Sequence, residues 1–254
     1  MTTLQPAVHA RGLMVTSGGW AYCEQVRALA RHTHYALLCG RYVKDGYLGP
    51  GLRSRRHLDW GNPTYLAEFA DEIEKAHARV GGKLVLIGVS YSGFAVATLA
   101  SHHPEMRPDR VIVIDSYLDL VARRHALPPT HETAKEIDLE TGGSEAALRA
   151  RTVSVSGLAR LVRGGTELSV IWSISPDEQR EFRGATCDRD ANANTLAELA
   201  RTLRQPVSAW VTESLHGHDL WDSGRRIMRG AYPGRRVVFE PGGGIPPNST
   251  CAAA

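Results

Sequence analysis

The sequence lacks the features that mark several classes of protein. Its 254 residues hold four cysteines, none of them paired in a C-x-x-C spacing: Cys23, Cys39, Cys187 and Cys251. This spacing suggests neither a zinc site nor a disulfide-stapled fold. No apolar run approaches the roughly 18 residues that a membrane span needs, and the polar start MTTLQPAVHA does not read as a signal peptide. We therefore expect a cytoplasmic protein with no membrane partner.

An excess of charge is also absent. The net charge is only +3, too small to predict binding to nucleic acid. Hydrophobic residues make up 43% of the chain and charged residues 22%, as in an ordinary globular protein. A chain of this length suits one domain, residues 1–254, with a large core.

Apolar runs that alternate with amphipathic helical patterns are present along most of the chain. Six runs are expected to be strands: GLMVTS (12–17), YALLCG (35–40), KLVLIGVS (83–90), RVIVIDS (110–116), VSAWVTE (207–213) and RRVVFEP (235–241). Continuous apolar strands separated by helices predict a mostly parallel sheet of about six core strands, covered by helices on both faces. Residues 117–190 interrupt this rhythm and are more polar. We expect them to form an inserted lid above the carboxyl ends of the strands, where open α/β sheets bind ligands.

The stretch LIGVSYSG (86–93) brings a serine from a strand into a tight turn that opens a helix. This context is typical of a nucleophile elbow. The turn needs small residues two before and two after the serine, and Gly88 and Ser92 occupy those positions. The alternative is that Ser90 only caps the helix over 92–103, since serine is a good helix cap.

On these residues the chain resembles the α/β-hydrolase superfamily. The similar stretches are GLMVTSGGW, LIGVSYSGFAVATLA, ANANTLAELARTLRQPVSAWV and YPGRRVVFEPGGG. The resemblance implies an α/β-hydrolase fold with Ser90 as the nucleophile and an oxyanion hole formed by the backbone N–H groups of Gly18 and Tyr91. It implies no cofactor and no metal, and as partner a small-molecule acyl substrate, free or bound to a carrier.

The acid of the triad has two candidates. Asp219 occupies the usual acid loop of these hydrolases. Asp115 ends the strand next to that of the nucleophile, where the thioesterases that release polyketides carry their acid. Either carboxylate can orient an imidazole. Asp115 has the stronger local argument, because an ionised carboxylate that closes an apolar strand is costly without a partner.

The general base is missing from its usual place. The family's histidine follows the glycines of the last loop, but here PGGGIPP puts Gly244 or Ile245 there. By elimination, His216 or His218 is the expected base, since the histidines at the far end of the helix after Ser90 are about 18 Å away along its axis. The basic stretch GLRSRRH (51–57) is a candidate for binding a carboxylate or a phosphate. The alternative is that it is an arginine-rich loop that only faces solvent.

Two functions follow from this pattern. The first is a serine-dependent acyl hydrolase with a rearranged triad, similar to thioesterases or tailoring hydrolases of small-molecule biosynthesis. The second is a non-hydrolytic relative that binds or cyclises a small molecule beneath its lid. Loss of the histidine from a triad costs about a million-fold in turnover, so the base decides between them.

Overall fold

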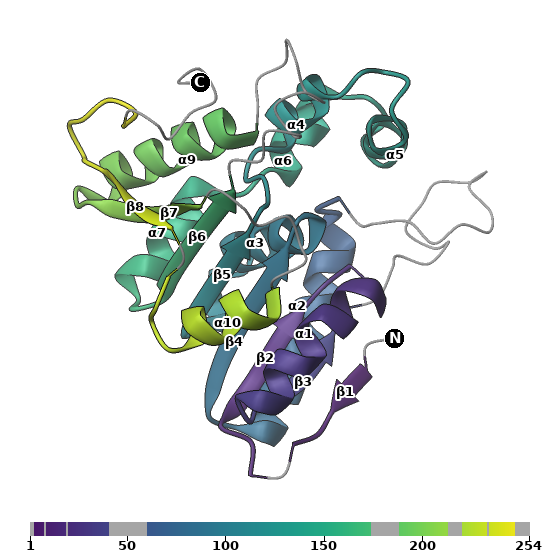
Figure 1. Ribbon diagram of the computed structural model, residues 1–254. Coiled ribbons are helices and arrows are strands. Elements are labelled where there is room, and N and C mark those ends of the chain that lie inside the picture. The colour runs from purple at the N-terminus through teal and green to yellow at the C-terminus, as the bar shows by residue number, and fades with distance from the viewer. Residues whose placement is uncertain are drawn as a thin grey trace.

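A single sheet forms the centre of the protein in a computed structural model (Figure 1). The structure describes residues 3–7, 9–18, 20–40, 60–173, 188–212, 220–232 and 234–246. Within these ranges the sheet has eight strands in the order β1-β3-β2-β4-β5-β6-β7-β8. Their bounds are β1 Thr3–Gln5, β2 Gly12–Thr16, β3 Ala36–Cys39, β4 Lys83–Val89, β5 Arg110–Ile114, β6 Glu167–Ser173, β7 Val207–Thr212 and β8 Arg235–Phe239.

The strands from β3 to β7 pair in parallel, and the two edge strands pair antiparallel to their neighbours. This is the mostly parallel α/β sheet that the sequence predicts. Because the core strands are apolar at consecutive positions, they bury side chains on both faces of the sheet. In β2, for example, Leu13 packs into one buried cluster and Met14 into the other.

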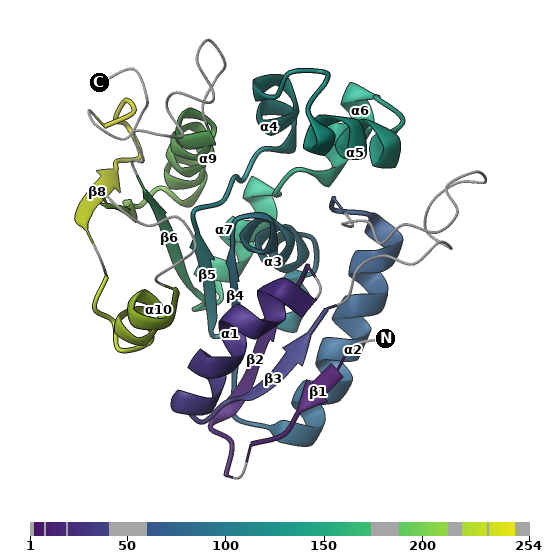
Figure 2. The same ribbon diagram turned by 45° about the vertical axis from the view of Figure 1, so that its right-hand side comes forward.

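Helices cover both faces of the sheet (Figures 1 and 2). The helices α1 (Trp20–His32) and α10 (Leu220–Met228) lie on one face. The other face is covered by α2 (Pro63–Val80), α3 (Tyr91–His102), α7 (Val155–Arg163) and α9 (Asp188–Leu203).

Residues 117–190, which we expected to form a lid, include elements of the central sheet and of its helix layer, and the role of the remaining residues as a lid stays a prediction. This range contains the core strand β6 and the helix α7, which packs closely on α3. The additional helices are α4 (Leu120–Ala126), α5 (Glu132–Thr141) and α6 (Glu145–Arg151), which stand together at one end of the sheet (Figure 2). The prediction of six strands also missed β1 and β6. The strand β6, ELSVIWS, follows a long polar stretch that we assigned to the insertion. Its short apolar run was therefore not recognised as a core strand.

The last strand corrects a second expectation. In the family that the sequence resembles, the loop after the last strand carries the histidine, so the resemblance implies that the loop after 235–241 lies at the same sheet edge as Ser90. However, β8 pairs antiparallel to β7, with Phe239 opposite Val207 and Arg235 opposite Val211. Because Val207 begins a parallel strand, the turn that follows β8 leaves the sheet at the edge opposite to the nucleophile. An apolar strand pattern does not encode the direction in which the strand pairs, so this arrangement could not be predicted from the residues of β8.

A disulfide also departs from the expectation. Cys23 in α1 pairs with Cys39 at the end of β3, across a sequence separation of 16 residues. Their Cα atoms are 5.7 Å apart. Both side chains are buried. A pairing between an isolated helix residue and an isolated strand residue has no short sequence signature, and only the packing of α1 on the sheet reveals it.

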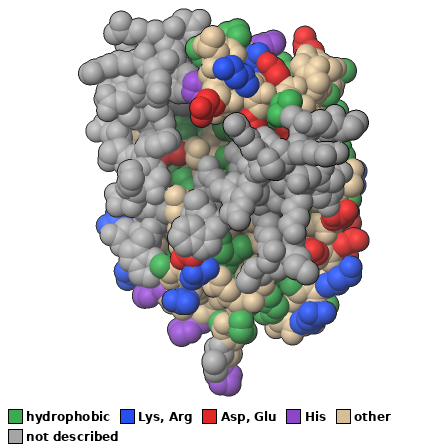
Figure 3. Space-filling model, turned by 90° about the vertical axis from the view of Figure 1, so that its right-hand side faces the viewer, with side chains coloured by type: hydrophobic (Ala, Val, Ile, Leu, Met, Phe, Trp, Pro, Cys, Tyr) green, Lys and Arg blue, Asp and Glu red, His purple; other side chains and the backbone are tan. Residues whose placement is uncertain are grey.

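Charged side chains of both signs are spread over the face shown in Figure 3, among the residues that are described. This distribution agrees with the small net charge of +3. Across the described ranges, no helix has both the length and the apolar character that a membrane crossing requires.

Candidate active site

Ser90 lies in the sharp turn between β4 and α3, as the sequence predicts. Its backbone has φ 52° and ψ −128°, a conformation that residues with a side chain rarely adopt. Its N–H donates to the carbonyl oxygen of Ile114 at 2.9 Å and so ties the turn to β5. The Ser90 hydroxyl makes no capping hydrogen bond to α3. The alternative role of this serine as a helix cap is therefore wrong.

The elbow leaves no room for a side chain at two positions, and a third, Ser92, supplies hydrogen bonds to the turn. A Cβ atom on Gly88 would lie 2.2 Å from the carbonyl oxygen of Ser92, and one on Gly93 would lie 2.7 Å from the Cβ of Ser116. The hydroxyl of Ser92 accepts from the N–H of Val89 at 2.8 Å and donates to the carbonyl oxygen of Val89 at 2.9 Å. Ser92 thus stands where these turns usually have glycine and closes the turn with its side chain.

Asp115 follows directly on β5, beside the elbow. The strand register pairs Val89 with Ile114, so Ser90 and Asp115 come next at the carboxyl ends of two neighbouring parallel strands. Asp115 has a left-handed φ of 42°, and its N–H donates to the carbonyl oxygen of Ile171 at 2.8 Å. The fold thereby brings a half-buried carboxylate to the same edge as the serine.

Asn192, from α9, holds the chain that follows Asp115. Its side-chain oxygen accepts from the N–H of Leu118 at 2.8 Å, and its side-chain nitrogen donates to the carbonyl oxygen of Ser116 at 2.6 Å. The Asn192 residue is 1% exposed, so it satisfies two backbone groups at a place that water reaches poorly. No short sequence signal points to Asn192, because it and Leu118 are 74 positions apart.

Gly18 and Tyr91, the expected oxyanion-hole residues, follow two adjacent strands. Gly18 comes two residues after β2, is buried, and has a φ of 93° that favours glycine. Tyr91 is the first residue of α3, where backbone N–H groups point toward the N-terminal end of the helix. Since β2 and β4 pair in parallel, both residues lie toward the carboxyl edge of the sheet. Their role in stabilising an oxyanion stays a prediction.

Four aromatic rings form a buried cluster behind the elbow: Trp60, Tyr91, Phe94 and Tyr117. The Tyr117 ring stacks on Phe94 with centroids 5.1 Å apart, and Trp60 contacts Tyr91 edge-on at the same separation. The guanidinium of Arg123 lies 5.1 Å from the centroid of Tyr117. The cluster therefore joins the first turn of α3 to the start of α2 and to the chain that enters α4.

Three predicted site residues and one predicted binding stretch lie outside the described residues. These are His216, His218 and Asp219, between β7 and α10, and the basic stretch 51–57. The structure thus brings together Ser90, Asp115, Gly18 and Tyr91 toward one edge, and the choice of base stays a prediction.

Several histidines in the described ranges have other partners. The His131 ring nitrogen accepts from the N–H of Thr133 and caps α5 at 3.2 Å. His77 bonds the carbonyl oxygen of Gly82 at 2.9 Å. His102, at the end of α3 far from Ser90, bonds the carbonyl oxygen of Thr152 at 2.9 Å. These rings contribute to helix ends and to packing.

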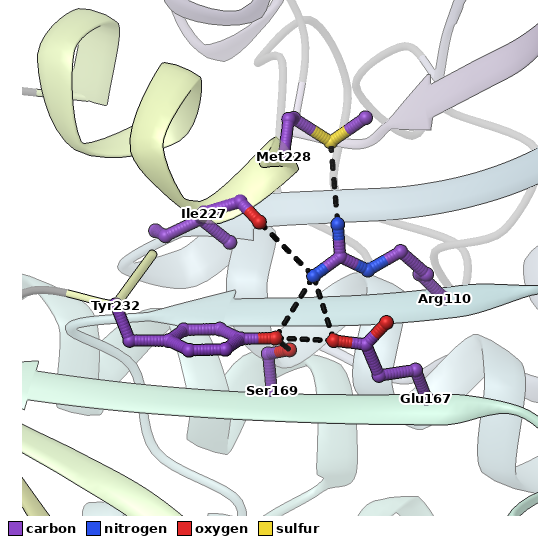
Figure 4. A network of polar contacts seen from close by, with 6 residues as sticks. All are labelled: Arg110, Glu167, Ser169, Ile227, Met228 and Tyr232. Carbon is purple, nitrogen blue, oxygen red and sulfur yellow. Dashed lines mark hydrogen bonds and ion pairs between the residues drawn. The ribbon is translucent and has the colours of Figure 1, made fainter. Parts of the chain in front are cut away.

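A second polar network joins β5, β6 and the end of α10 (Figure 4). One guanidinium nitrogen of Arg110 donates to Glu167 at 2.8 Å, to the carbonyl oxygen of Ile227 at 3.1 Å and to the hydroxyl of Tyr232 at 2.9 Å. Arg110 and Glu167 are the first residues of β5 and β6. The network therefore lies at the edge opposite to Ser90, and we assign it a structural role.

Tyr232 is the centre of this network. Its hydroxyl also donates to Glu167 and bonds the Ser169 hydroxyl at 2.9 Å, while its ring stacks on Trp210 with centroids 3.7 Å apart. Burial, followed by the hydrogen bond to Glu167, raises the pKa of Tyr232 above its ordinary value of 10.0. The neutral phenol therefore fastens the chain after α10 to the sheet at neutral pH.

Comparison with solved structures finds similar folds at low sequence identity. A carboxyl esterase of the fungus Tuber melanosporum is 16% identical, with a TM-score of 0.50 over 78% of this chain and 68% of the esterase. An acylaminoacyl peptidase of Pyrococcus horikoshii is 15% identical, with a TM-score of 0.58 over 91% of this chain but only 37% of the peptidase. No family model and no curated protein matches the sequence. At this identity the likeness concerns the fold alone.

Proposed function

Because the chain has the α/β-hydrolase fold, we propose that it is a serine-dependent hydrolase of ester or thioester bonds. Its substrate is a small hydrophobic acyl group, free or bound to a carrier. Ser90 is the nucleophile in this proposal, and Asp115 is the acid. The observation that carries it is the strained turn of Ser90, whose φ of 52° holds a serine at the end of a central strand. Such strain persists where function retains it.

The proposed reaction follows from these positions. The Ser90 hydroxyl attacks the acyl carbonyl, and an imidazole takes its proton. The backbone N–H groups of Tyr91 and Gly18 stabilise the negative oxygen of the tetrahedral intermediate. The imidazole then gives the proton to the departing alcohol or thiol, and water releases the acyl group from the serine in the same way.

His218 or His216 supplies the imidazole in this scheme. Both belong to the segment between β7 and α10, and β7 runs parallel to the strands that end at Ser90 and Asp115. A segment that leaves β7 therefore starts at the same sheet edge as the serine. Because Asp219 directly adjoins His218, the two side chains can hardly both serve one site, which favours Asp115 as the partner of the histidine.

A non-hydrolytic role, in binding or cyclising a small molecule, is the second candidate. The direction of β8 favours it, since the turn that carries the family's histidine leaves this sheet at the edge opposite to Ser90. A histidine in the turn after β8 would lie at the opposite edge of the sheet from Ser90 and could not take its proton. A triad with the histidine in the family's usual position is therefore not available to this chain. The choice between hydrolysis and the non-hydrolytic role then depends on whether a histidine of the β7–α10 segment acts as the base.

Labelling with a fluorophosphonate probe separates the two functions, because the reaction requires an activated serine hydroxyl. We expect the wild-type protein to be labelled at Ser90, identified by peptide mass spectrometry, and Ser90→Ala to be unlabelled. We expect His218→Ala or His216→Ala to slow the labelling by about 10²-fold or more. Ser156→Ala, at an exposed serine in α7, is the matched control, since it removes a hydroxyl and leaves the nucleophile and its turn intact. A folded wild-type protein that stays unlabelled would contradict the hydrolase and favour the binding role.

A further inference from the structure

The Cys23–Cys39 disulfide anchors the segment that carries Gly18. At the start of this segment, Thr16 pairs with Cys39 in the β2–β3 register. The N–H of Gly40 also donates to the carbonyl oxygen of Thr16 at 2.8 Å. At its end, Cys23 in the first turn of α1 is covalently bound to the same Cys39. Thr16 and Cys23 are thus both fixed to one point of β3, and we call the stretch between them, which carries Gly18, the arch.

The disulfide is packed in the core, so its surroundings restrict the movement of the two cysteines that it joins. Cys23 is 4% exposed and Cys39 is 5% exposed, and both belong to the cluster between α1 and the sheet. Two polar side chains also face the Cys23 sulfur, Gln5 at 3.9 Å and Arg27 at 4.0 Å. The cross-link is therefore part of the core beside the arch and not a tether at the surface.

We infer that this disulfide is a positioning cross-link that holds the Gly18 amide where the oxyanion forms. The inference rests on the proposed function, in which Gly18 is an oxyanion donor. Such donors act on the transition state and must already be in place when the reaction occurs. A displacement of about 1 Å costs about 10²-fold in rate. Loss of the cross-link should therefore reduce the rate of the chemical step more than it weakens substrate binding.

Reduction breaks the cross-link without changing any residue. Dithiothreitol gives two electrons and two protons to the two cysteine sulfurs, and its own two thiols close to a cyclic disulfide. The N–H groups of Gln5 and Arg27 would stabilise the Cys23 sulfur as it leaves as a thiolate. The activity of the protein is thus expected to depend on the redox state of this pair.

The experiment compares oxidised and reduced protein in the Cys187→Ser, Cys251→Ser background, where Cys23 and Cys39 are the two remaining cysteines. The rate of fluorophosphonate labelling at Ser90 should fall by about 10- to 100-fold on reduction. With p-nitrophenyl butyrate as substrate, kcat should fall by a similar factor while KM changes less than about threefold. Reoxidation should restore both. Cys23→Ala with Cys39→Ala should match the reduced protein and no longer respond to the reagent.

Hydrogen exchange of the peptide that covers residues 16–23 provides a readout that needs no activity. Exchange in this peptide should become faster on reduction, while the peptide of β4 stays protected. Equal labelling rates in the two redox states, or unchanged exchange at 16–23, would overturn the inference. Failure of the oxidised protein to label at all would instead contradict the proposed function, and the exchange measurement would still decide whether the disulfide holds the arch.

Discussion

Ser90 and Asp115 end two neighbouring parallel strands, and both have left-handed backbone conformations, with φ of 52° and 42°. The hydrogen bond from the Ser90 N–H to Ile114, the residue before Asp115, joins the two turns at 2.9 Å. Two strained residues side by side are unusual, because each costs of order 1–3 kcal/mol. The shared strain suggests that the two side chains act together.

The strain at Ser90 predicts a trade-off between stability and activity. We expect Ser90→Gly to raise the free energy of unfolding by about 1 kcal/mol, since glycine adopts this backbone without strain, and to abolish probe labelling. Urea denaturation of both proteins measures the difference. Ser90→Ala is the control, because it removes the hydroxyl but keeps the strain. A loss of stability in Ser90→Gly would show that the turn is not strained.

The choice of acid can be tested by paired substitutions. We expect Asp115→Asn to lower kcat by about 10²- to 10⁴-fold, because the amide cannot stabilise the imidazolium that forms during the reaction. Asp219→Asn should lower it much less. Steady-state kinetics with an activated ester measures both. The reverse order of effects would assign the acid to Asp219.

Asn192 is predicted to stabilise the turn that follows Asp115. Asn192→Leu leaves the N–H of Leu118 and the carbonyl oxygen of Ser116 buried without partners, each at a cost of about 1–3 kcal/mol. We expect the free energy of unfolding and kcat to fall together. Asn194→Leu, two residues along the same helix but exposed, is the matched control. Similar unfolding midpoints for the two variants would contradict the role of Asn192.

The stability of the protein should fall in alkaline solution because of Tyr232. Burial and the Glu167 hydrogen bond raise its pKa above 10.0 in the folded state. The contribution is therefore complete below pH 10 and is lost as the pH rises from 10 through the folded pKa. Tyr232→Phe should be less stable at pH 8, and the difference from wild type should shrink above pH 10. Urea midpoints at these pH values measure it, and a constant difference would contradict the prediction.

The sequence determined the local features of this protein. The apolar runs predicted the strands that both helix layers cover. Asparagine followed by proline is typical of a helix start, and in α2 the Asn62 side chain accepts from the N–H groups of Thr64 and Tyr65. The glycine and serine spacing around Ser90 predicted its turn, because close packing of strand and helix restricts which residues fit. These signals depend only on residues a few positions apart, so they can be recognised without knowledge of the tertiary structure.

Only the tertiary structure decided the relations between distant segments. The antiparallel direction of β8, the Cys23–Cys39 disulfide and the bonds from Asn192 to the turn after Asp115 all join residues far apart in the sequence. The strand β6 became recognisable only by its pairing between β5 and β7. Such contacts arise when whole helices and strands pack together, and no short stretch of sequence records which partner an element will meet.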